Sequence, residues 1–452
     1  MPFDLTREYI DNLKELIDQY DEKTVSNLIS PLHPADIAEI FNEITIEEAK
    51  FLYMILEGET RADVIIELEE DTRERFLKAL SGEEIAKQFI EEMDSDDAAD
   101  VIGELSEDLQ EEILQHIEDT DQAGDIVDLL SYDEDTAGGL MAKELIRVNE
   151  NWNVLTCLRE MRKQAEDVDE VYYVYVVDDD NVLKGILSLK KLLLARRDSK
   201  ISSIYKSDII SVRTDTHKED VANIMDKYDL VALPVVDSID RLLGRITIDD
   251  VVDVIREEAE KDYQMISGIA EDVEPSDNVI LLTRARLPWL FIGLLGGILA
   301  ALVLGGYEEE LKIYPEMAFF IPLIAAMGGN VGVQSSAIIV QGLASDTLGI
   351  ESTGRKLFKE VSVALINGVI LSSLALVYNL LTLESLALTI SVSLALFAVI
   401  LFASIFGTSI PLLLEKLKID PALATGPFIT TMNDIISLFI YLLIGRMLYG
   451  II

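Results

Sequence analysis

Five long apolar segments in the C-terminal part of this 452-residue chain constrain its fold more than any other feature. A helix of roughly 20 apolar residues crosses a hydrocarbon core of about 30 Å. Backbone groups inside a bilayer must be satisfied within the protein, so each segment predicts one membrane-spanning helix. The segments are 287–307, 317–343, 358–381, 386–413 and 422–449.

Charge divides the chain at the point where these segments begin. Residues 1–283 carry 28 basic and 71 acidic side chains, whereas residues 284–452 carry 9 and 11. Such an acidic body repels nucleic acid and attracts cations, although solubility alone is an alternative reason for the acidity. With one cysteine and three scattered histidines, an ion site must use oxygen ligands, which suit hard cations such as Mg²⁺ or Ca²⁺.

Lys and Arg residues predict the orientation of the spans in the plasma membrane. Seven flank one side, within 284–286, 355–359 and 416–418, and two flank the other, Lys312 and Arg446. Basic residues favour the cytoplasmic side, so we expect a cytoplasmic acidic body and an extracytoplasmic C-terminus. The opening "MPFDLTREYIDNLKEL" does not have the pattern of a signal peptide, which agrees with this orientation.

Residues 1–131 predict an all-α domain. Apolar residues recur at i, i+3 and i+4 with almost no β-branched alternation. The segments "PADIAEIF", "RADVIIEL", "DDAADVIGEL" and "QAGDIVDLL" form a weak, irregular repeat. This pattern predicts a superhelical stack of helix pairs.

Residues 132–257 change to two similar units, each predicted as helix, buried strand, polar turn, strand and helix. The segments "VYYVYVVDDD" and "VALPVVDSID" are the buried strands, and the repeated α/β pattern resembles a tandem pair of CBS domains. Such pairs bind adenine nucleotides such as ATP, or sense ions. Gly244, Thr247 and Asp250 match the family's nucleotide pattern, whereas Lys191 replaces the acidic residue in the first unit. The resemblance therefore implies nucleotide binding at one site.

The second apolar segment contains "IPLIAAMGGNVGVQSSA", residues 321–337. Pro322 and the pair Gly328–Gly329 predict irregular backbone, and Asn330 and Gln334 form an amide pair at i, i+4. Irregular backbone at membrane depth indicates a cavity or pore wall. The alternative is that small residues allow tight packing while the amides join helices.

The fifth segment contains a carboxylate, Asp434, in apolar surroundings. A charge at the bilayer centre costs roughly 2.5 to 3.5 kcal/mol on insertion scales, so such a residue indicates function. Thr430 lies on the same helical face, with Ser437 and Tyr441 continuing it, and Gly426–Pro427 predicts a bend. No Lys or Arg occurs in the interior of any predicted span, away from its ends, so a static ion pair is not expected. We expect a pore wall in which Asp434 binds passing cations, with two copies on the axis of a symmetric dimer suiting hydrated Mg²⁺.

The whole chain resembles the MgtE family of magnesium channels. The resemblance lies in "PLIAAMGGNVGVQSSA", in "DPALATGPFITTMND", and in the domain order: helical domain, CBS pair, connecting helix 258–283 and five-helix transmembrane domain 284–452. It implies a homodimer in which the second and fifth helices of both copies line one pore. It also implies that the connecting helix closes this pore when cytosolic Mg²⁺ is abundant.

The resemblance further implies a set of Mg²⁺-sensing carboxylates, for each of which a solvated surface charge is the alternative. Bound Mg²⁺ would bridge side chains that otherwise repel one another, and would thereby favour a compact state. At position 217, where the family pattern predicts an acidic residue, the chain has His217. The implied ligands are Asp96, Asp100, Glu219, Asp229, Asp250, Asp253, Glu258, Asp262 and Asp420, in addition to Asp434 in the pore.

Other functions stay open beside a Mg²⁺-selective channel. A less selective transporter of Co²⁺, Mn²⁺ or Ca²⁺ would have the same ligand types. A nucleotide-sensing membrane scaffold would not transport at all. An intramembrane aspartyl enzyme needs two carboxylates that share one proton, whereas the sequence places only Asp434 deep in a span, so we do not expect an enzyme.

Overall fold

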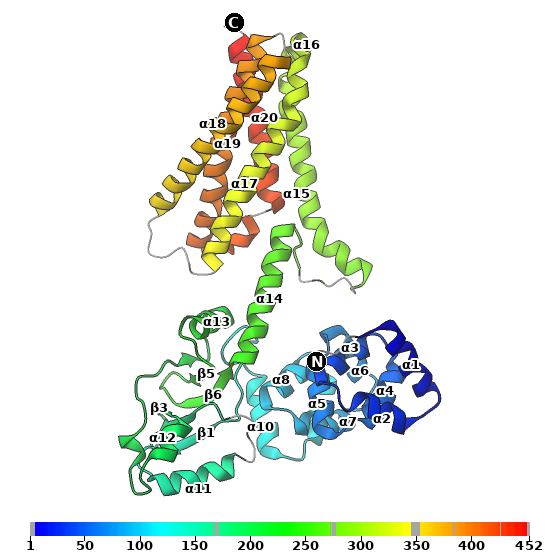
Figure 1. The fold of residues 1–452 in the computed structure, drawn as a ribbon, viewed down its shortest axis with the longest axis vertical. Helices are drawn as coiled ribbons and strands as arrows, with labels where there is room; N and C mark the ends of the chain where they lie inside the picture. The colour runs from blue at the N-terminus through cyan, green and yellow to red at the C-terminus, as the bar shows by residue number, and fades with distance from the viewer. Residues whose placement is uncertain are drawn as a thin grey trace. The chain divides into compact units, whose positions relative to one another are not determined.

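The computed structural model describes residues 5–165, 168, 171–271, 273, 277–344, 353–382, 385–424 and 426–449. The chain divides into two compact units, Met1–Ile255 and Arg256–Ile452, and each is described by itself (Figure 1). The predicted fold class is confirmed: an α-helical N-terminal domain precedes a CBS pair, a connecting helix and five helices of membrane length.

Short helices build the N-terminal domain. Polar caps mark their starts, as in the capping boxes of Thr45 with Glu48 and of Ser81 with Glu84. Alternate helices pack together, α3 on α5, α7 on α9 and α8 on α10, which is the predicted stack of helix pairs. The helices are α1 (Arg7–Asp18), α2 (Glu22–Ile29), α3 (Pro34–Asn42), α4 (Ile46–Ile55), α5 (Gly58–Ile66), α6 (Glu70–Leu77), α7 (Gly82–Gln88), η1 (Ile90–Glu92), α8 (Ser95–Gly103), α9 (Glu107–His116) and α10 (Thr120–Leu129).

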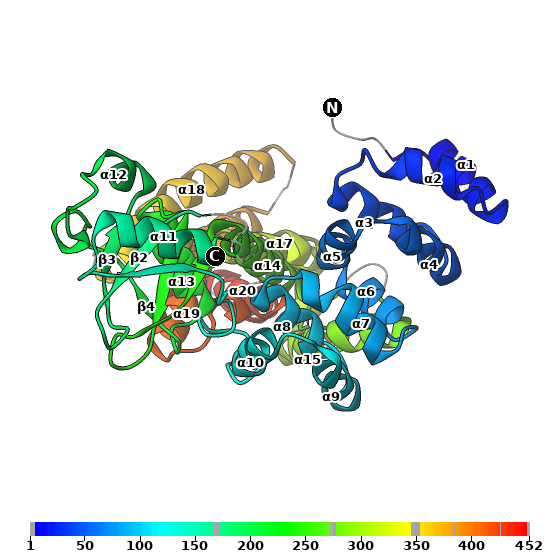
Figure 2. The ribbon, with the colours of Figure 1, turned by 90° about the horizontal axis from the view of Figure 1, so that it is seen from below.

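The stack places α8 and α10 beside the CBS pair, whereas α1 to α4 lie at its far end (Figure 1, Figure 2). Inside the stack, the buried aromatic rings of Tyr53 on α4, Phe76 on α6 and Phe89 after α7 pack together, with ring centroids 5.1 to 6.4 Å apart. The apolar core continues into the second CBS unit through Met141, Val221 and Ile246. The docking of the helical domain on the CBS pair is thus part of one hydrophobic core.

Each CBS unit contains a three-stranded sheet in which the first pair of strands is parallel and the second antiparallel. The middle strand of each is fully buried, as predicted. The turns before β3 and β6 meet: Leu183 N–H donates to Asp240 O at 2.9 Å, and Leu242 N–H to Asn181 O at 3.0 Å. The elements are β1 (Ile146–Asn149), α11 (Val154–Gln164), β2 (Val174–Val177), β3 (Leu183–Leu187), α12 (Leu189–Leu194), η2 (Ile201–Ser203), β4 (Val212–Arg213), α13 (Lys218–Lys227), β5 (Ala232–Val236) and β6 (Leu242–Thr247).

One continuous helix, α14 (Ile248–Ser267), closes the second CBS unit and continues as the connecting helix. It ends at Gly268, whose φ of +82° is a conformation that suits glycine. The first membrane helix then begins at Val279, capped by Asn278, and not at residue 287. The range 258–283 therefore holds the second half of α14 and the first turn of the next helix.

Among the described residues of the second unit, five helices are long and apolar enough to cross a membrane. Helix α19 is the most enclosed, packing against α17, α18 and α20, whereas α15 packs mainly on α20. Helix α17 is continuous, so the predicted irregular backbone is absent from it: Pro322 is its second residue, where a missing N–H costs little. The elements are α15 (Val279–Gly306), α16 (Glu308–Ile313), η3 (Pro315–Phe320), α17 (Ile321–Ala344), α18 (Thr353–Thr382), α19 (Leu386–Lys416), η4 (Pro421–Ala424) and α20 (Gly426–Tyr449).

Candidate functional site

Helices α17 and α20 pack together and carry all of the predicted ion-pathway residues. On α17 the side chains of Asn330 and Gln334 are exposed, and on α20 those of Thr430 and Asp434 are half-buried. Gly329 joins the two sets, because a Cβ built on it would lie 3.3 Å from Thr430 Cγ2 and 3.5 Å from Asp434 Oδ1. The predicted polar residues of the second and fifth spans thus share one region.

Asp434 forms no ion pair with any Lys, Arg or His in the described part of the chain. Its neighbour Thr430 donates a hydrogen bond to the carbonyl of Gly426 at 2.9 Å, one turn earlier. The carboxylate therefore keeps its oxygens available to a ligand. A half-buried, unpaired carboxylate in a span is an arrangement that attracts a cation.

Gly426 and Pro427 form the start of α20 rather than a bend within it. Gly426 has a φ of +49°, and a Cβ on it would overlap the carbonyl oxygen of Ile266 near the end of α14. A Cβ on Gly268 would lie 2.6 Å from Pro427 Cγ. The end of the connecting helix thus packs directly on the start of the predicted pore helix.

Two residues predicted on the Asp434 face lie elsewhere. Ser437 is fully buried against Gly328, and Tyr441 is fully buried and donates a hydrogen bond to the carbonyl of Met317 at 2.9 Å. Helical spacing does place them near Asp434, but the helix rotates this part of the stripe into the bundle. The exposed polar face is therefore shorter than predicted.

A second carboxylate in a membrane-length helix was not identified from the sequence. Glu360 of α18 accepts a hydrogen bond from Ser335 of α17 at 3.3 Å, and the Ser335 hydroxyl lies 3.2 Å from that of Ser404 in α19. The signal was an acidic residue near the start of the third apolar segment. Asp434 is therefore not the only carboxylate in these helices.

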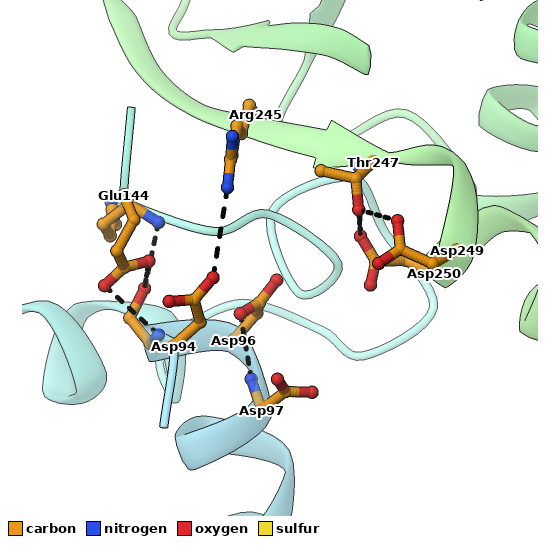
Figure 3. Close-up of polar contacts among 10 residues, drawn as sticks. Asp94, Asp96, Asp97, Glu144, Arg245, Thr247, Asp249 and Asp250 are labelled. Carbon is orange, nitrogen blue, oxygen red and sulfur yellow. Dashed lines mark hydrogen bonds and ion pairs between the residues drawn. The ribbon is translucent and has the colours of Figure 1, made fainter. Parts of the chain in front are cut away.

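In the first unit, an acidic cluster lies at the start of α8 (Figure 3). Asp94, Asp96 and Glu144 each offer a carboxylate oxygen within 4.8 Å of the others. Glu144 is held there by Ser95, whose N–H and hydroxyl donate to its two carboxylate oxygens at 3.2 and 2.8 Å. Three carboxylates this close suit a divalent cation, and a built-in cation, Arg245, lies 3.9 Å from Asp94.

The cluster extends to α14 through its electrostatics. Desolvation by the surrounding protein, and then the carboxylates of Asp97 and Asp250, raise the pKa of Asp96 well above its usual value. Desolvation and then Asp250 raise the pKa of Asp97 to about 7. Desolvation also raises the pKa of Asp250, against the lowering effect of hydrogen bonds from Thr247. The predicted ligands Asp96 and Asp250 are thus close neighbours, with Asp100 on the same helix as Asp96 and exposed.

Asp94, Asp97 and Glu144 were missed because they follow no repeat pattern.

The predicted nucleotide residues have structural contacts of their own. The backbone N–H and the hydroxyl of Thr247 donate to Asp250 Oδ2 at 3.0 and 2.8 Å, and the hydroxyl also contacts Asp249 (Figure 3). These bonds cap the start of α14. Gly244 allows close approach of Ala142, since a Cβ on it would lie 2.6 Å from the Ala142 carbonyl oxygen.

A third group of predicted ligands lies in the second unit, outside the spans. Desolvation, followed by the charges of Asp420 and Glu258, raises the pKa of Asp262 on α14. These three carboxylates come from α14 and from the segment before η4, so the structure brings them together. Lys261 offsets part of this charge and lies 3.4 Å from Glu258.

The remaining predicted ligands are exposed and less closely grouped. Glu219 lies on α13 and Asp229 follows it, while Asp253 lies one turn after Asp250 and raises that residue's pKa. His217, found where an acidic residue was expected, caps α13 by accepting the N–H of Glu219 at 3.4 Å.

Comparison with protein families and with known proteins agrees with this arrangement. Residues 321–444 match the MgtE family described as divalent cation transporters, residues 32–135 match the MgtE intracellular N domain, and 137–198 and 201–257 match CBS domains. The magnesium transporter MgtE of Thermus thermophilus is 33% identical over 97% of this chain and 98% of its own length. That of Bacillus subtilis is 32% identical over 92% of each chain.

Solved structures match the first part of the chain. The cytosolic domain of the Mg²⁺ channel MgtE in complex with ATP aligns with a TM-score of 0.50 at 33% identity, over 54% of this chain and 99% of that one. The soluble part of a magnesium transporter aligns with the same TM-score at 31% identity, over 56% and 98%. Since relatives of this identity match along nearly the whole length, the chain belongs to the MgtE family.

Proposed function

We propose that this chain is a Mg²⁺-selective channel of the plasma membrane, which carries Mg²⁺ into the cell through a homodimeric pore. Curated relatives named magnesium transporters cover nearly the whole chain and support the substrate. The distribution of Lys and Arg supports a cytoplasmic N-terminus and an extracytoplasmic C-terminus. Asp434 serves as the ion ligand, and α17 and α20 of both copies line the pore.

The observation that carries this proposal is an exposed polar face within helices of membrane length. Asn330 and Gln334 are exposed on α17, next to the half-buried Asp434 of α20. Such side chains do not face lipid, because hydrocarbon offers them no hydrogen bonds. They face water, a second copy of the chain, or both. One copy of the chain supplies one Asp434, so a dimer supplies two. A two-fold axis beside this face encloses a hydrated pathway with two carboxylates.

Intracellular Mg²⁺ closes the pore in this proposal. The acidic cluster of Asp94, Asp96 and Glu144, together with Asp250, is the first sensing site, and Glu258, Asp262 and Asp420 form the second. Ions that bridge these groups stabilise the compact arrangement of the elements that bear them. The packing of Gly268 on Pro427 supports α14 as the part that acts on the pore helix.

Adenine nucleotide binds the CBS pair in this proposal, at Gly244, Thr247 and Asp250. A relative's cytosolic domain was solved in complex with ATP, which supports this assignment. The residues fit in type, but Thr247 and Asp250 are bonded to each other. A nucleotide that uses them must therefore compete with the cap of α14.

The test is Mg²⁺ flux into liposomes that contain the full chain and a trapped Mg²⁺ indicator. Asp434→Asn keeps the shape of the side chain and removes its charge, so flux is expected to fall at least tenfold. Glu309→Gln, an exposed carboxylate of α16, is the control and is expected to leave flux unchanged. Normal flux in the Asp434 variant would contradict the proposed ion site.

The same liposomes separate the alternative functions. Equal rates for Co²⁺, Mn²⁺ or Ca²⁺ would identify a less selective divalent transporter. A chain that carries no divalent ion, yet binds nucleotide, would be the non-transporting scaffold.

A further inference from the structure

Asn433 lies one residue before Asp434, but its side chain is directed into the helix bundle. It is fully buried, and neither its Nδ2 nor its Oδ1 forms a hydrogen bond within the described residues. Burying an amide without a partner costs roughly 1 to 3 kcal/mol by protein mutational data. Within the described residues, the contacts of Asn433 are therefore packing contacts.

The amide fills a notch that Gly332 leaves in α17. A Cβ built on Gly332 would overlap Asn433 Nδ2 and lie 3.0 Å from its Cγ. One turn away, a Cβ on Gly328 would overlap the hydroxyl of the fully buried Ser437 and lie 3.1 Å from its Cβ. Two side chains at i, i+4 on α20 therefore fit two glycines at i, i+4 on α17, which fixes the register of the pair.

Helix α19 packs against the backbone of α17 at Gly332. A Cβ on Gly407 of α19 would overlap the carbonyl oxygen of Gly332 and lie 3.1 Å from its carbonyl carbon, so the backbones of α17 and α19 touch there. Between the two notches, Gly329 faces Asp434 Oδ1. The fit of Asn433 into Gly332 thus determines how α20 is rotated, and the rotation determines where the Asp434 carboxylate lies.

We propose that Asn433 is a positioning residue for Mg²⁺ permeation, which holds the Asp434 carboxylate at the pore face by filling the Gly332 notch. This inference rests on the proposed function of Asp434 as the ion ligand. Side-chain tips lie roughly 5 Å from a helix axis, so a rotation of about 20° moves the carboxylate by nearly 2 Å. That displacement breaks the hydrogen bonds by which the carboxylate holds a hydrated Mg²⁺, because such bonds are limited to lengths of about 2.5 to 3.0 Å.

An exchange of side-chain size tests the notch in the full chain. Gly332→Ala, Asn433→Ala and the double variant are compared in liposomes for the half-saturating Mg²⁺ concentration and the maximal rate. Each single variant is expected to raise the half-saturating concentration about tenfold, the size of effect that misplacement by an ångström or more produces. The double variant is expected to be closer to the parent than Gly332→Ala, because the shortened side chain leaves room for the new methyl group.

Gly297→Ala on α15 is the control, because a Cβ there meets no atom within 4 Å. Additive effects of the two substitutions would overturn the proposal, as would single variants that alter the maximal rate alone. Unfolding temperatures of the parent, the two single variants and the double variant, measured in detergent, report the packing independently of transport. If the parent protein shows no Mg²⁺ flux, both the proposed function and the role of Asp434 as ion ligand are wrong. If the changes in unfolding temperature of the two single variants add up in the double variant, the packing of Asn433 against Gly332 is wrong.

Discussion

Mg²⁺ binding at the start of α8 is expected to release protons, because the ion and the protons use the same carboxylates. The pKa of Asp97 is raised to about 7, and that of Asp96 is raised well above its usual value. A raised carboxyl pKa means that the folded protein keeps protons which the unfolded chain loses near pH 4. Without metal, stability therefore falls as the pH rises from about 4 to about 7, and the loss is complete above that range.

The size of the effect follows from the pKa of Asp97. A group with a pKa of about 7 is about 0.9 protonated at pH 6 and about 0.1 protonated at pH 8. A metal ion bound by the neighbouring carboxylates favours the ionised form of Asp97, so Asp97 alone should release up to about 0.9 proton at pH 6 and up to about 0.1 at pH 8. The apparent Mg²⁺ affinity should be about tenfold weaker at pH 6 than at pH 8, or about 1.4 kcal/mol. Asp96 adds to both effects in the same direction.

Calorimetric titration of the full chain in detergent measures both quantities. At each pH the titration is repeated in two buffers with different protonation enthalpies, and the difference in heat gives the number of protons released. Asp97→Asn should lower this number at pH 6, whereas Asp108→Asn, an exposed carboxylate of α9, should not. NaCl at matched ionic strength controls for screening. Equal heats in both buffers at pH 6, or an affinity that does not change with pH, would refute the competition.

Two further predictions concern the pore face. Gly329→Ala places a methyl group 3.5 Å from Asp434 Oδ1 and is expected to lower Mg²⁺ flux severalfold. The unfolding temperature should not fall, since alanine favours a helix over glycine by roughly 0.5 to 1 kcal/mol. Gly297→Ala is the matched control, and an unchanged flux in the Gly329 variant would contradict the placement of Asp434. Asn330→Cys is expected to form a disulfide between two copies, because Asn330 is exposed on the face proposed to lie at the two-fold axis, and the buried native Cys157 does not compete. Leu374→Cys, at an exposed position of α18, should not form one. No cross-link from the Asn330 variant would count against the dimer axis.

Elements that follow from the alternation of apolar and water-exposed residues were predicted correctly from the sequence. The spans, the buried CBS strands and the helical N-terminal domain all follow from where apolar residues recur. The repeated CBS pattern even located Thr247 and Asp250, although as residues that cap α14 in this structure.

The environment of each polar residue within the membrane was harder to predict. Lipid tails and neighbouring helices are equally apolar, so a stripe that includes Thr430, Asp434 and Ser437 does not reveal where exposure ends. Ser437 is buried because Gly328 leaves room for it, and that fit depends on the register of two helices about 100 residues apart. Glu144 joins Asp94 and Asp96 for a similar reason, since Ser95 holds it across 49 residues of sequence.

Helix α14 belongs to both compact units, because the division at Arg256 falls within it. Asp250 in its first turn joins the acidic cluster, whereas the glycine after its last turn packs on Pro427. Its 20 residues contain no Gly or Pro and make a rod of about 30 Å. A tilt of about 10° at one end of such a rod moves the other by about 5 Å, which is more than the width of a water molecule. If α14 acts on the pore helix as proposed, a small change in angle at the carboxylates would become a displacement of several ångströms at the other end of this helix, and no loop would have to refold.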